Sequence, residues 1–202
     1  AITKVLGGVA DKDLLTKDEL VSADNKNGGI VLIGSHVKKT TMQFEELKNC
    51  KKPLEFIEFH AARVLEEGGL DKEVKEVISK AEEFISKGQS VVVYTSRVKL
   101  DTDDKDKILQ ISVDISNAVV RVIGDLNIKP SFIVAKGGIT SSDVGTKALR
   151  VKKATVMGQI KPGIPVWMTG EESKFPNMPY VIFPGNVGEV TTLREAVEIL
   201  MG

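Results

Sequence analysis

The segment Ser131–Asp143 reads SFIVAKGGITSSD, in which a short apolar run leads through two glycines into a polar, helix-forming stretch. An apolar run of this length beside turn residues is typical of a buried strand. Glycines lack a Cβ atom and tolerate positive φ, so backbone N–H groups can approach an anion closely. A helix that begins there adds a partial positive charge. The segment therefore predicts an anion-binding junction or, as the alternative, a plain glycine turn with a Ser/Thr cap.

The alternation of strands and helices extends in both directions from this segment. Short apolar or β-branched runs predict strands over 30–33, 54–58, 90–94, 131–135, 154–157, 165–168 and 180–183. Helix-forming segments are predicted over 11–24, 40–49, 61–67, 71–87, 105–126, 140–149 and 191–201. Strands that are apolar on both faces and separated by helices imply a doubly wound α/β fold. We expect a largely parallel sheet with helices on both faces and a strand-rich C-terminal part.

The predicted helix over 105–126 carries an apolar stripe that we expect to be buried. It consists of Ile108, Ile111, Ile115, Val119 and Val122. The charge run 101–107 at its start lacks the glycine and the terminal glutamate of a calcium-binding loop. We therefore expect that run to be a solvated loop that opens the helix over 105–126.

The charge balance and the cysteine count exclude several classes of protein. The 202 residues contain 28 Lys plus Arg and 28 Asp plus Glu, and this neutral balance argues against a nucleic-acid or membrane-surface protein. The apolar runs are too short to cross a bilayer. The single cysteine, Cys50, cannot form an internal disulfide, and the histidines His36 and His60 are not spaced as metal ligands. We expect a cytoplasmic protein without a metal site of its own.

Two further loops follow strands at the edge where ligands bind in doubly wound folds. In the loop Gly34–Thr41, Ser35 could bind a phosphate, a ribose or a base, and the neighbouring lysines could supply charge; a solvated loop is the alternative. In the loop Phe183–Glu189, glycines permit close approach of the backbone, and a simple turn is the alternative. Arg97, at the end of a third strand, could face the same crevice or form a surface ion pair.

The segment Gly158–Trp167 contains the turn signal Pro162-Gly163. We expect this segment to be mainly architectural, with Gly158 able to line a pocket. For Trp167, a role in the core or in a pocket wall is preferred over stacking on a base.

Five elements recur together in an order that resembles the C-terminal nucleotide-binding domain of the four-carbon acid sugar kinase family. They are Gly34-Ser35 with Thr40-Thr41 and Gln43, then Val91–Ser96, Gly137–Ser141, Gly158–Pro165 and Pro184–Gly188. The resemblance covers residues from about Ile30 to Met201. It implies that residues 30–202 are the nucleotide-binding domain and that residues 1–29 connect it to a preceding sugar-acid domain. The Asp-Asp-x-Thr-Gly type of motif of that first domain does not occur in this sequence.

Members of that family transfer phosphate from ATP, with magnesium, to sugar acids such as threonate or erythronate. Carried over by position, the resemblance implies nucleotide contacts from Ser35, Gly137, Gly138, Ile139, Thr140 and Gly185, and then from Ser141, Gly158, Asn186 and Gly188. The family often has Glu where Ile139 stands, which leaves only a backbone role there. No residue has a clear claim to be the general base, although Lys136 or Arg97 could stabilise phosphate charge.

Two other functions stay open at this point. One is a non-catalytic nucleotide-binding module, and the other is a sugar-phosphate-binding enzyme on a similar fold. ATP or ADP is the expected ligand, the sugar acid is expected to bind through the preceding domain, and a homodimer is a further expectation.

Overall fold

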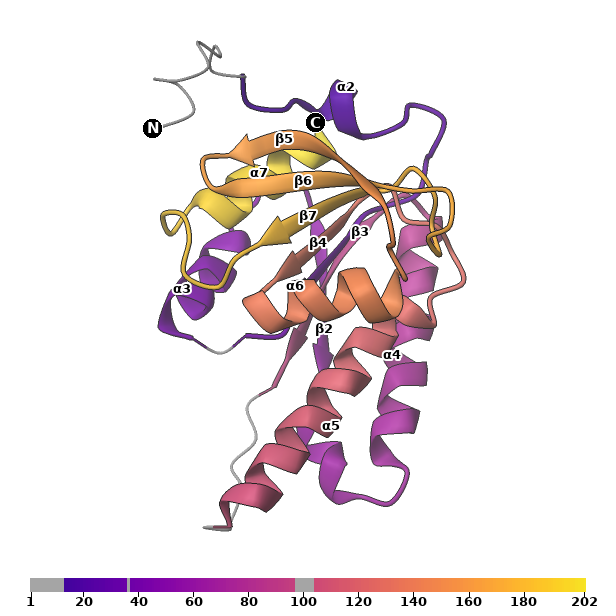
Figure 1. The fold of residues 1–202 in the computed structure, drawn as a ribbon, viewed down its shortest axis with the longest axis vertical. Coiled ribbons are helices and arrows are strands. Elements are labelled where there is room, and N and C mark those ends of the chain that lie inside the picture. Colours follow the sequence, from indigo (N-terminus) through magenta and orange to yellow (C-terminus); the bar gives the residue numbers. More distant parts are fainter. Residues whose placement is uncertain (1–12, 36, 97–103) are drawn as a thin grey trace.

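The computed structural model describes residues 13–35, 37–96 and 104–202, and a seven-stranded sheet runs through them (Figure 1). The strands are β1 (Ile30–Ile33), β2 (Leu54–Phe59), β3 (Ser90–Thr95), β4 (Ile133–Lys136), β5 (Ala154–Lys161), β6 (Ile164–Thr169) and β7 (Pro179–Phe183). The helices are α2 (Lys17–Leu20), α3 (Lys38–Leu47), η1 (Ala61–Leu65), α4 (Gly69–Ser86), α5 (Lys105–Gly124), α6 (Gly138–Asp143), η2 (Val144–Ala148) and α7 (Thr192–Met201). In the described ranges, each helix is too short or too polar to span a bilayer.

The strands lie in the order β2-β3-β1-β4-β7-β6-β5. The pairs β2–β3, β3–β1, β1–β4 and β4–β7 are parallel, whereas β5 and β6 form an antiparallel hairpin that continues the sheet from β7. The chain places β2 and β3 on one side of β1 and β4 on the other, so the strand order reverses at β1. The predicted doubly wound, largely parallel sheet with a strand-rich C-terminal part is confirmed.

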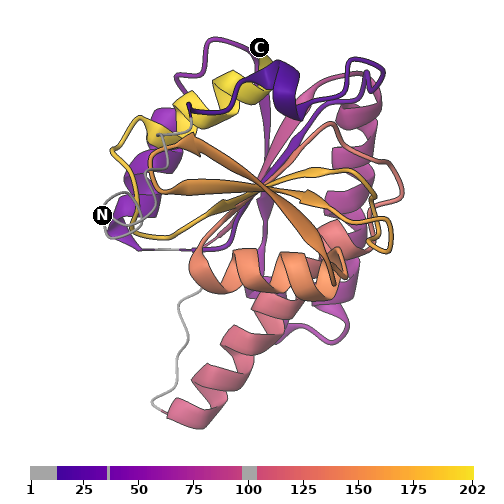
Figure 2. The same ribbon diagram turned by 45° about the horizontal axis from the view of Figure 1, so that its top comes forward.

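Helices cover both faces of the sheet, which explains why the central strands are apolar without alternation. One face carries α3 and α7, and the other carries α4, α5 and α6 (Figure 2). Along β1, Ile30 and Leu32 pack into the core beneath α4 and α5, while Val31 and Ile33 pack beneath α7. All four side chains are buried. The ends of the central strands therefore lie between two helical layers.

The predicted apolar stripe of α5 is buried only in its C-terminal half. Val119 and Val122 are buried, but Ile108, Ile111 and Ile115 are partly exposed, so the prediction is wrong for these three. The 20 residues of α5 extend about 30 Å, whereas strands of 4 to 6 residues span about 13–20 Å. The first turns of α5 therefore project past the carboxyl edge of the sheet (Figure 1).

The described part of the N-terminal segment packs on the same core as the rest of the chain. Leu15 and Leu20 are buried beside α7, and the Leu15 amide donates to the Gln159 carbonyl at 2.9 Å. The helix predicted over 11–24 is wrong in length, because only Lys17–Leu20 is helical and residues 11 and 12 lie outside the described ranges. The connecting role of residues 1–29 stays a prediction.

Candidate functional site

The candidate site lies where β1, β4 and β7 end side by side at the carboxyl edge of the sheet. The Gly137 amide donates to the Phe183 carbonyl at 2.9 Å, which joins the loops after β4 and β7. The loop after β1 is equally close, because a Cβ atom at Gly34 would lie 2.5 Å from Thr140 Oγ1, and one at Gly137 would lie 3.2 Å from Ser35 Cβ. Three loops that are far apart in sequence thus converge.

Glycine has two different uses in these loops. Gly137 has φ 127°, which a residue with a side chain rarely adopts. At Gly138 and Gly185, by contrast, a Cβ atom would meet no heavy atom within 4 Å beyond the adjoining residues of the chain. The backbone at these two positions therefore borders open space. The neighbouring Ile139 is 75% exposed, so its side chain leaves this part of the loop uncovered.

The first turn of α6 is fixed from inside by Ser141. Its backbone N–H and its hydroxyl both donate to the Gly137 carbonyl, at 2.9 and 2.7 Å. The hydroxyl of Ser141 is thus used within the fold. The amides that precede it belong to the first helical turn, which has no carbonyl partners of its own and carries the positive end of the helix dipole. The helix continues without a break into η2.

A buried lysine joins the loop after β7 to the end of β4. Lys136 Nζ donates to the carbonyls of Pro184 and Gly185 at 2.7 and 3.0 Å, and it lies 4.3 Å from the centroid of the Phe183 ring. Burial, and then the nearby charge of Lys39, lower the pKa of Lys136 to about 8. The sequence indicates Lys136 only as a possible charge for phosphate, and its burial is not predicted from the local pattern.

Helix α3 holds the other side of the same loop. Thr40 Oγ1 donates to the Gly185 carbonyl at 3.3 Å, and Lys39 Nζ donates to the Gly188 carbonyl at 3.1 Å. The Gln43 side-chain amide binds the carbonyls of Val187 and Glu189. Sequence reasoning missed the roles of Thr40 and Gln43. The available signal was their spacing with Leu47, which places two polar residues on the buried face of an amphipathic helix.

An apolar cavity of about 420 Å³ lies on one side of α6, and we call it the aromatic cavity. Its walls include Trp167, Tyr180 and Pro184, and its rim includes Gly138, Ser141 and Ser142. The Tyr180 hydroxyl donates to the Ser141 carbonyl, and burial raises the pKa of this phenol above its usual range. Trp167 is therefore part of a pocket wall, as preferred from the sequence.

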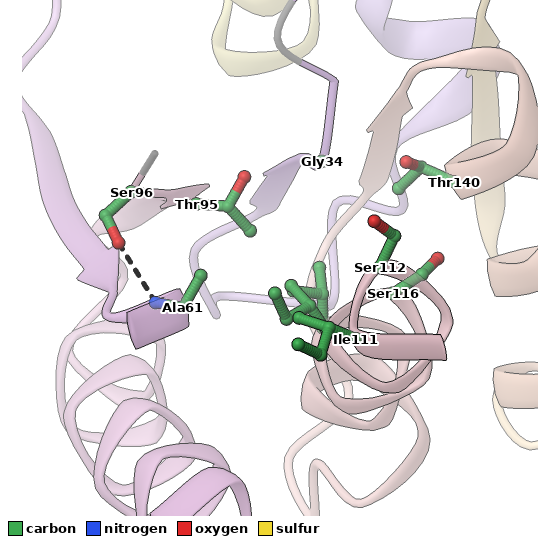
Figure 3. Close-up of a pocket in the computed structure, with 10 residues that line it drawn as sticks. Gly34, Ala61, Thr95, Ser96, Ile111, Ser112, Ser116 and Thr140 are labelled. Carbon is green, nitrogen blue, oxygen red and sulfur yellow. Dashed lines mark hydrogen bonds between the residues drawn. The ribbon is translucent and has the colours of Figure 1, made fainter. Parts of the chain in front are cut away.

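A second cavity, of about 240 Å³, lies on the α5 side of the same loop (Figure 3). We call it the hydroxyl cavity, because Thr95, Ser96, Ser112, Ser116 and Thr140 surround an aliphatic floor that includes Ile111 and Ile115. Ser96 Oγ accepts from the Ala61 amide at 3.0 Å (Figure 3). We call residues 137–140 the glycine loop. Gly138 lines the aromatic cavity and Thr140 lines the hydroxyl cavity, so this loop lies between the two cavities.

Gly158 is not brought to this loop. It lies in β5 opposite Val166, which pairs with Val181, which in turn pairs with Val134 of β4. Three strand spacings of about 4.8 Å therefore separate Gly158 from β4. Its backbone has φ 142° at an irregularity of the β5–β6 pairing.

The remaining predicted residues have varied surroundings. Asn186 is exposed, and the carbonyl of Gly188 is bound by Lys39. His60 Nδ1 contacts the carboxylate of Glu73 at 2.9 Å. Arg97 and His36 lie outside the described residues. Within the described ranges, no three His, Cys, Asp or Glu side chains gather in a way that could hold a metal ion.

Several solved structures share this fold. A DUF1537 protein from Bordetella bronchiseptica, crystallised with bound citrate as a domain-swapped dimer, is 18% identical, with a TM-score of 0.65 over 87% of this chain and 41% of its own. A DUF1537 protein from Haemophilus influenzae is 20% identical, with a TM-score of 0.62 over 98% of this chain and 44% of its own. The present chain therefore spans less than half the length of these structures. No curated protein matches the sequence.

A known family of protein domains matches most of this chain, and its description agrees with the observed architecture and with the family resemblance of the loops. The family is described as a nucleotide-binding C-terminal domain, and it matches residues 30–193, which include every strand of the sheet. The match begins at the first residue of β1 and ends in α7. The chain belongs to the family of nucleotide-binding C-terminal domains.

Proposed function

We propose that this chain binds ATP at the carboxyl edge of its sheet, as the nucleotide-binding domain of a kinase that phosphorylates a four-carbon sugar acid such as threonate or erythronate. One observation carries the proposal. The side-chain-free backbone at Gly138 and Gly185 borders open space, and the buried ammonium group of Lys136 binds the Gly185 carbonyl at 3.0 Å. Free amides and a cation around an open space are what a polyphosphate requires.

The two cavities suggest how the nucleotide lies. The phosphates accept hydrogen bonds from the backbone amides of Gly138–Thr140, within reach of the Ser35 hydroxyl. The base enters the aromatic cavity against Trp167, since this cavity is apolar and Gly138 lines it. The terminal phosphate then points toward Thr140 and the hydroxyl cavity, where the acceptor approaches.

Magnesium would accompany the nucleotide in this proposal. Among the described residues there is no cluster of carboxylates for it, and Mg²⁺ is commonly held by substrate phosphates, a few waters and one or two carboxylates. When bound, the ion neutralises charge that develops on the phosphate oxygens. This chain contributes the amides of α6 and the positive potential of Lys136 and Lys39.

The acceptor side of the reaction is assigned to another domain. The DUF1537 structures are more than twice as long as the matched region, which leaves room for a sugar-acid domain in the proteins of this type. Closure of such a domain over the glycine loop would exclude water and align the reacting oxygens. A homodimer, by analogy with the Bordetella protein, and a cytoplasmic location belong to the same proposal.

Calorimetric titration with ATP and magnesium tests the binding step directly. Gly138→Asp places a carboxylate in the open space next to the phosphates, so we expect at least a tenfold loss of affinity. Ser86→Asp is the matched control, because it adds the same charge at an exposed side chain at the C-terminal end of α4, which leads into the amino end of β3 and so lies at the opposite edge of the sheet. Equal affinities of the parent chain and Gly138→Asp would remove the glycine loop from the site.

The alternatives predict a different ranking of ligands. A sugar-phosphate enzyme would be stabilised more by sugar phosphates than by ATP or ADP in a thermal shift assay. A non-catalytic module would bind ATP equally well but would support no transfer to threonate or erythronate when it is joined to its complete protein.

A further inference from the structure

Lys136 is unusual among the basic residues that the structure describes, because it is fully buried. Its relative exposure is 0%, and no other described lysine or arginine falls in the buried class. Lysine is almost never fully buried unless it is paired, because removal of its charge from water is costly. The contacts of Lys136 therefore call for an explanation.

The partners of this ammonium group are neutral. Within the described part of the chain, its bonds go to the carbonyls of Pro184 and Gly185, and the Phe183 ring lies beside it. These contacts solvate a cation without cancelling its charge. The two carbonyls belong to the loop that also contains the open backbone of Gly185, while Gly137 and Gly138 follow Lys136 directly in sequence.

In the described ranges, no carboxylate contacts the ammonium group of Lys136. The strands β1, β4 and β7 have no other charged side chain, and α3 presents the cation Lys39, which binds the Gly188 carbonyl. Two further charged side chains, Lys38 of α3 and Glu189 in the loop before α7, are exposed to solvent. The other charged groups of α3, α6, η2 and α7 form ion pairs: Glu45–Lys48, Glu46–Arg194, Arg194–Glu198, Asp143–Lys147 and Lys161–Glu195.

We propose that Lys136 is the positioning residue and fixed counter-charge of the nucleotide site, and that the bound phosphates supply the negative partner it lacks in the free protein. The inference rests on the proposed function. Lys136 fixes the Gly185 loop beside the glycine loop through two carbonyls, and its charge acts on the phosphates from beneath the backbone. It transfers no proton to the substrate.

A measurable consequence is that, in mildly alkaline solution, the protein takes up a proton at Lys136 when it binds ATP. In the free protein, burial and Lys39 hold the pKa of Lys136 at about 8, so a large fraction is neutral at pH 8.5. Phosphate charge favours the protonated form and raises this pKa. ATP affinity should therefore fall as the pH rises above about 8, by up to about tenfold per pH unit.

The test is calorimetric titration of the 202-residue chain with ATP and magnesium at pH 8.5, in two buffers that differ in ionisation enthalpy. We expect the parent chain to take up about half a proton or more per bound ATP. Lys136→Met and Lys136→Gln should take up none, and at pH 7 both should bind about 10- to 100-fold more weakly. Lys136→Gln keeps a donor for the carbonyls, so it separates loss of charge from loss of the loop anchor.

Lys174→Met is the matched control. The pKa of Lys174 is also lowered, chiefly by burial, and its ammonium lies 5.2 Å from the Phe175 ring, but it lies in the connection that enters the amino end of β7. It should behave like the parent chain. ATP binding by the parent without proton uptake, or unchanged uptake in both Lys136 variants, would overturn the inference alone. Failure of the parent to bind ATP would overturn the proposed function together with it.

Discussion

Glycines lie at both edges of the sheet, and two at the carboxyl edge, Gly138 and Gly185, differ in their surroundings from Gly28 and Gly29 at the amino edge. Before β1, a Cβ atom at Gly28 would lie 1.9 Å from the Gln89 carbonyl oxygen, and one at Gly29 would lie 2.2 Å from the Phe132 ring. Beyond its carboxyl end, across the neighbouring strands β4 and β7, Gly138 and Gly185 border open space. At Gly28 and Gly29, protein atoms occupy the place of the missing side chain, whereas at Gly138 and Gly185 no heavy atom beyond the adjoining residues of the described chain does.

This difference separates glycine used for packing from glycine kept for a ligand. A packed core cannot accept an added methyl group without strain. An open binding site can accept the methyl group, but it then has less room for its ligand. Glycine substitutions at the two edges should therefore divide into those that reduce stability and those that reduce binding.

The largest loss of stability is expected for Gly28→Ala. The new methyl group would overlap the backbone of Gln89, which cannot move independently of β3, so the free energy of unfolding should fall by about 3 kcal/mol. Urea denaturation measures this. ATP affinity of the molecules that remain folded should be unchanged, and a variant as stable as the parent would remove the distinction between the edges.

An intermediate loss of stability is expected for Gly34→Ala. Gly34 lies at the carboxyl edge of the sheet but is closely packed. Its methyl group would lie 2.5 Å from Thr140 Oγ1, so we expect a cost of about 1–3 kcal/mol. The double variant Gly34→Ala/Thr140→Ala removes the opposing atoms, and its loss should be smaller than the sum of the single losses. Additive losses in a double-mutant cycle would show that this contact is not the cause.

The smallest change in stability is expected for Gly185→Ala. No atom opposes the new methyl group, so the free energy of unfolding should stay within about 0.5 kcal/mol of the parent value. ATP affinity should nevertheless fall about tenfold, because the methyl group enters the space proposed for the phosphates. Calorimetry and urea denaturation on the same sample provide both numbers, and a stability loss without a binding loss would place Gly185 with the packing glycines.

The sequence by itself determined the order of strands and helices and the fold class. Runs such as Val91–Val93 are apolar without alternation. This pattern is typical of strands in a parallel sheet that is covered by helices on both faces. The carboxyl-edge rule for doubly wound sheets then selected the loops after β1, β3, β4 and β7, of which residues 97–103 after β3 lie outside the described ranges. Residue patterns along the chain contain this information because strand and helix periods are local properties.

Only the tertiary structure decided which glycines border open space and which are filled. Gly28 and Gly138 each adjoin another glycine in sequence, yet a Cβ atom at Gly28 would meet Gln89, which is distant in sequence, and one at Gly138 would face open space. The same holds for the complete burial of Lys136, the remoteness of Gly158 and the exposed first half of α5. These properties depend on strand order and on the relative lengths of helices and strands, which are set by long-range packing and are not encoded in any short segment.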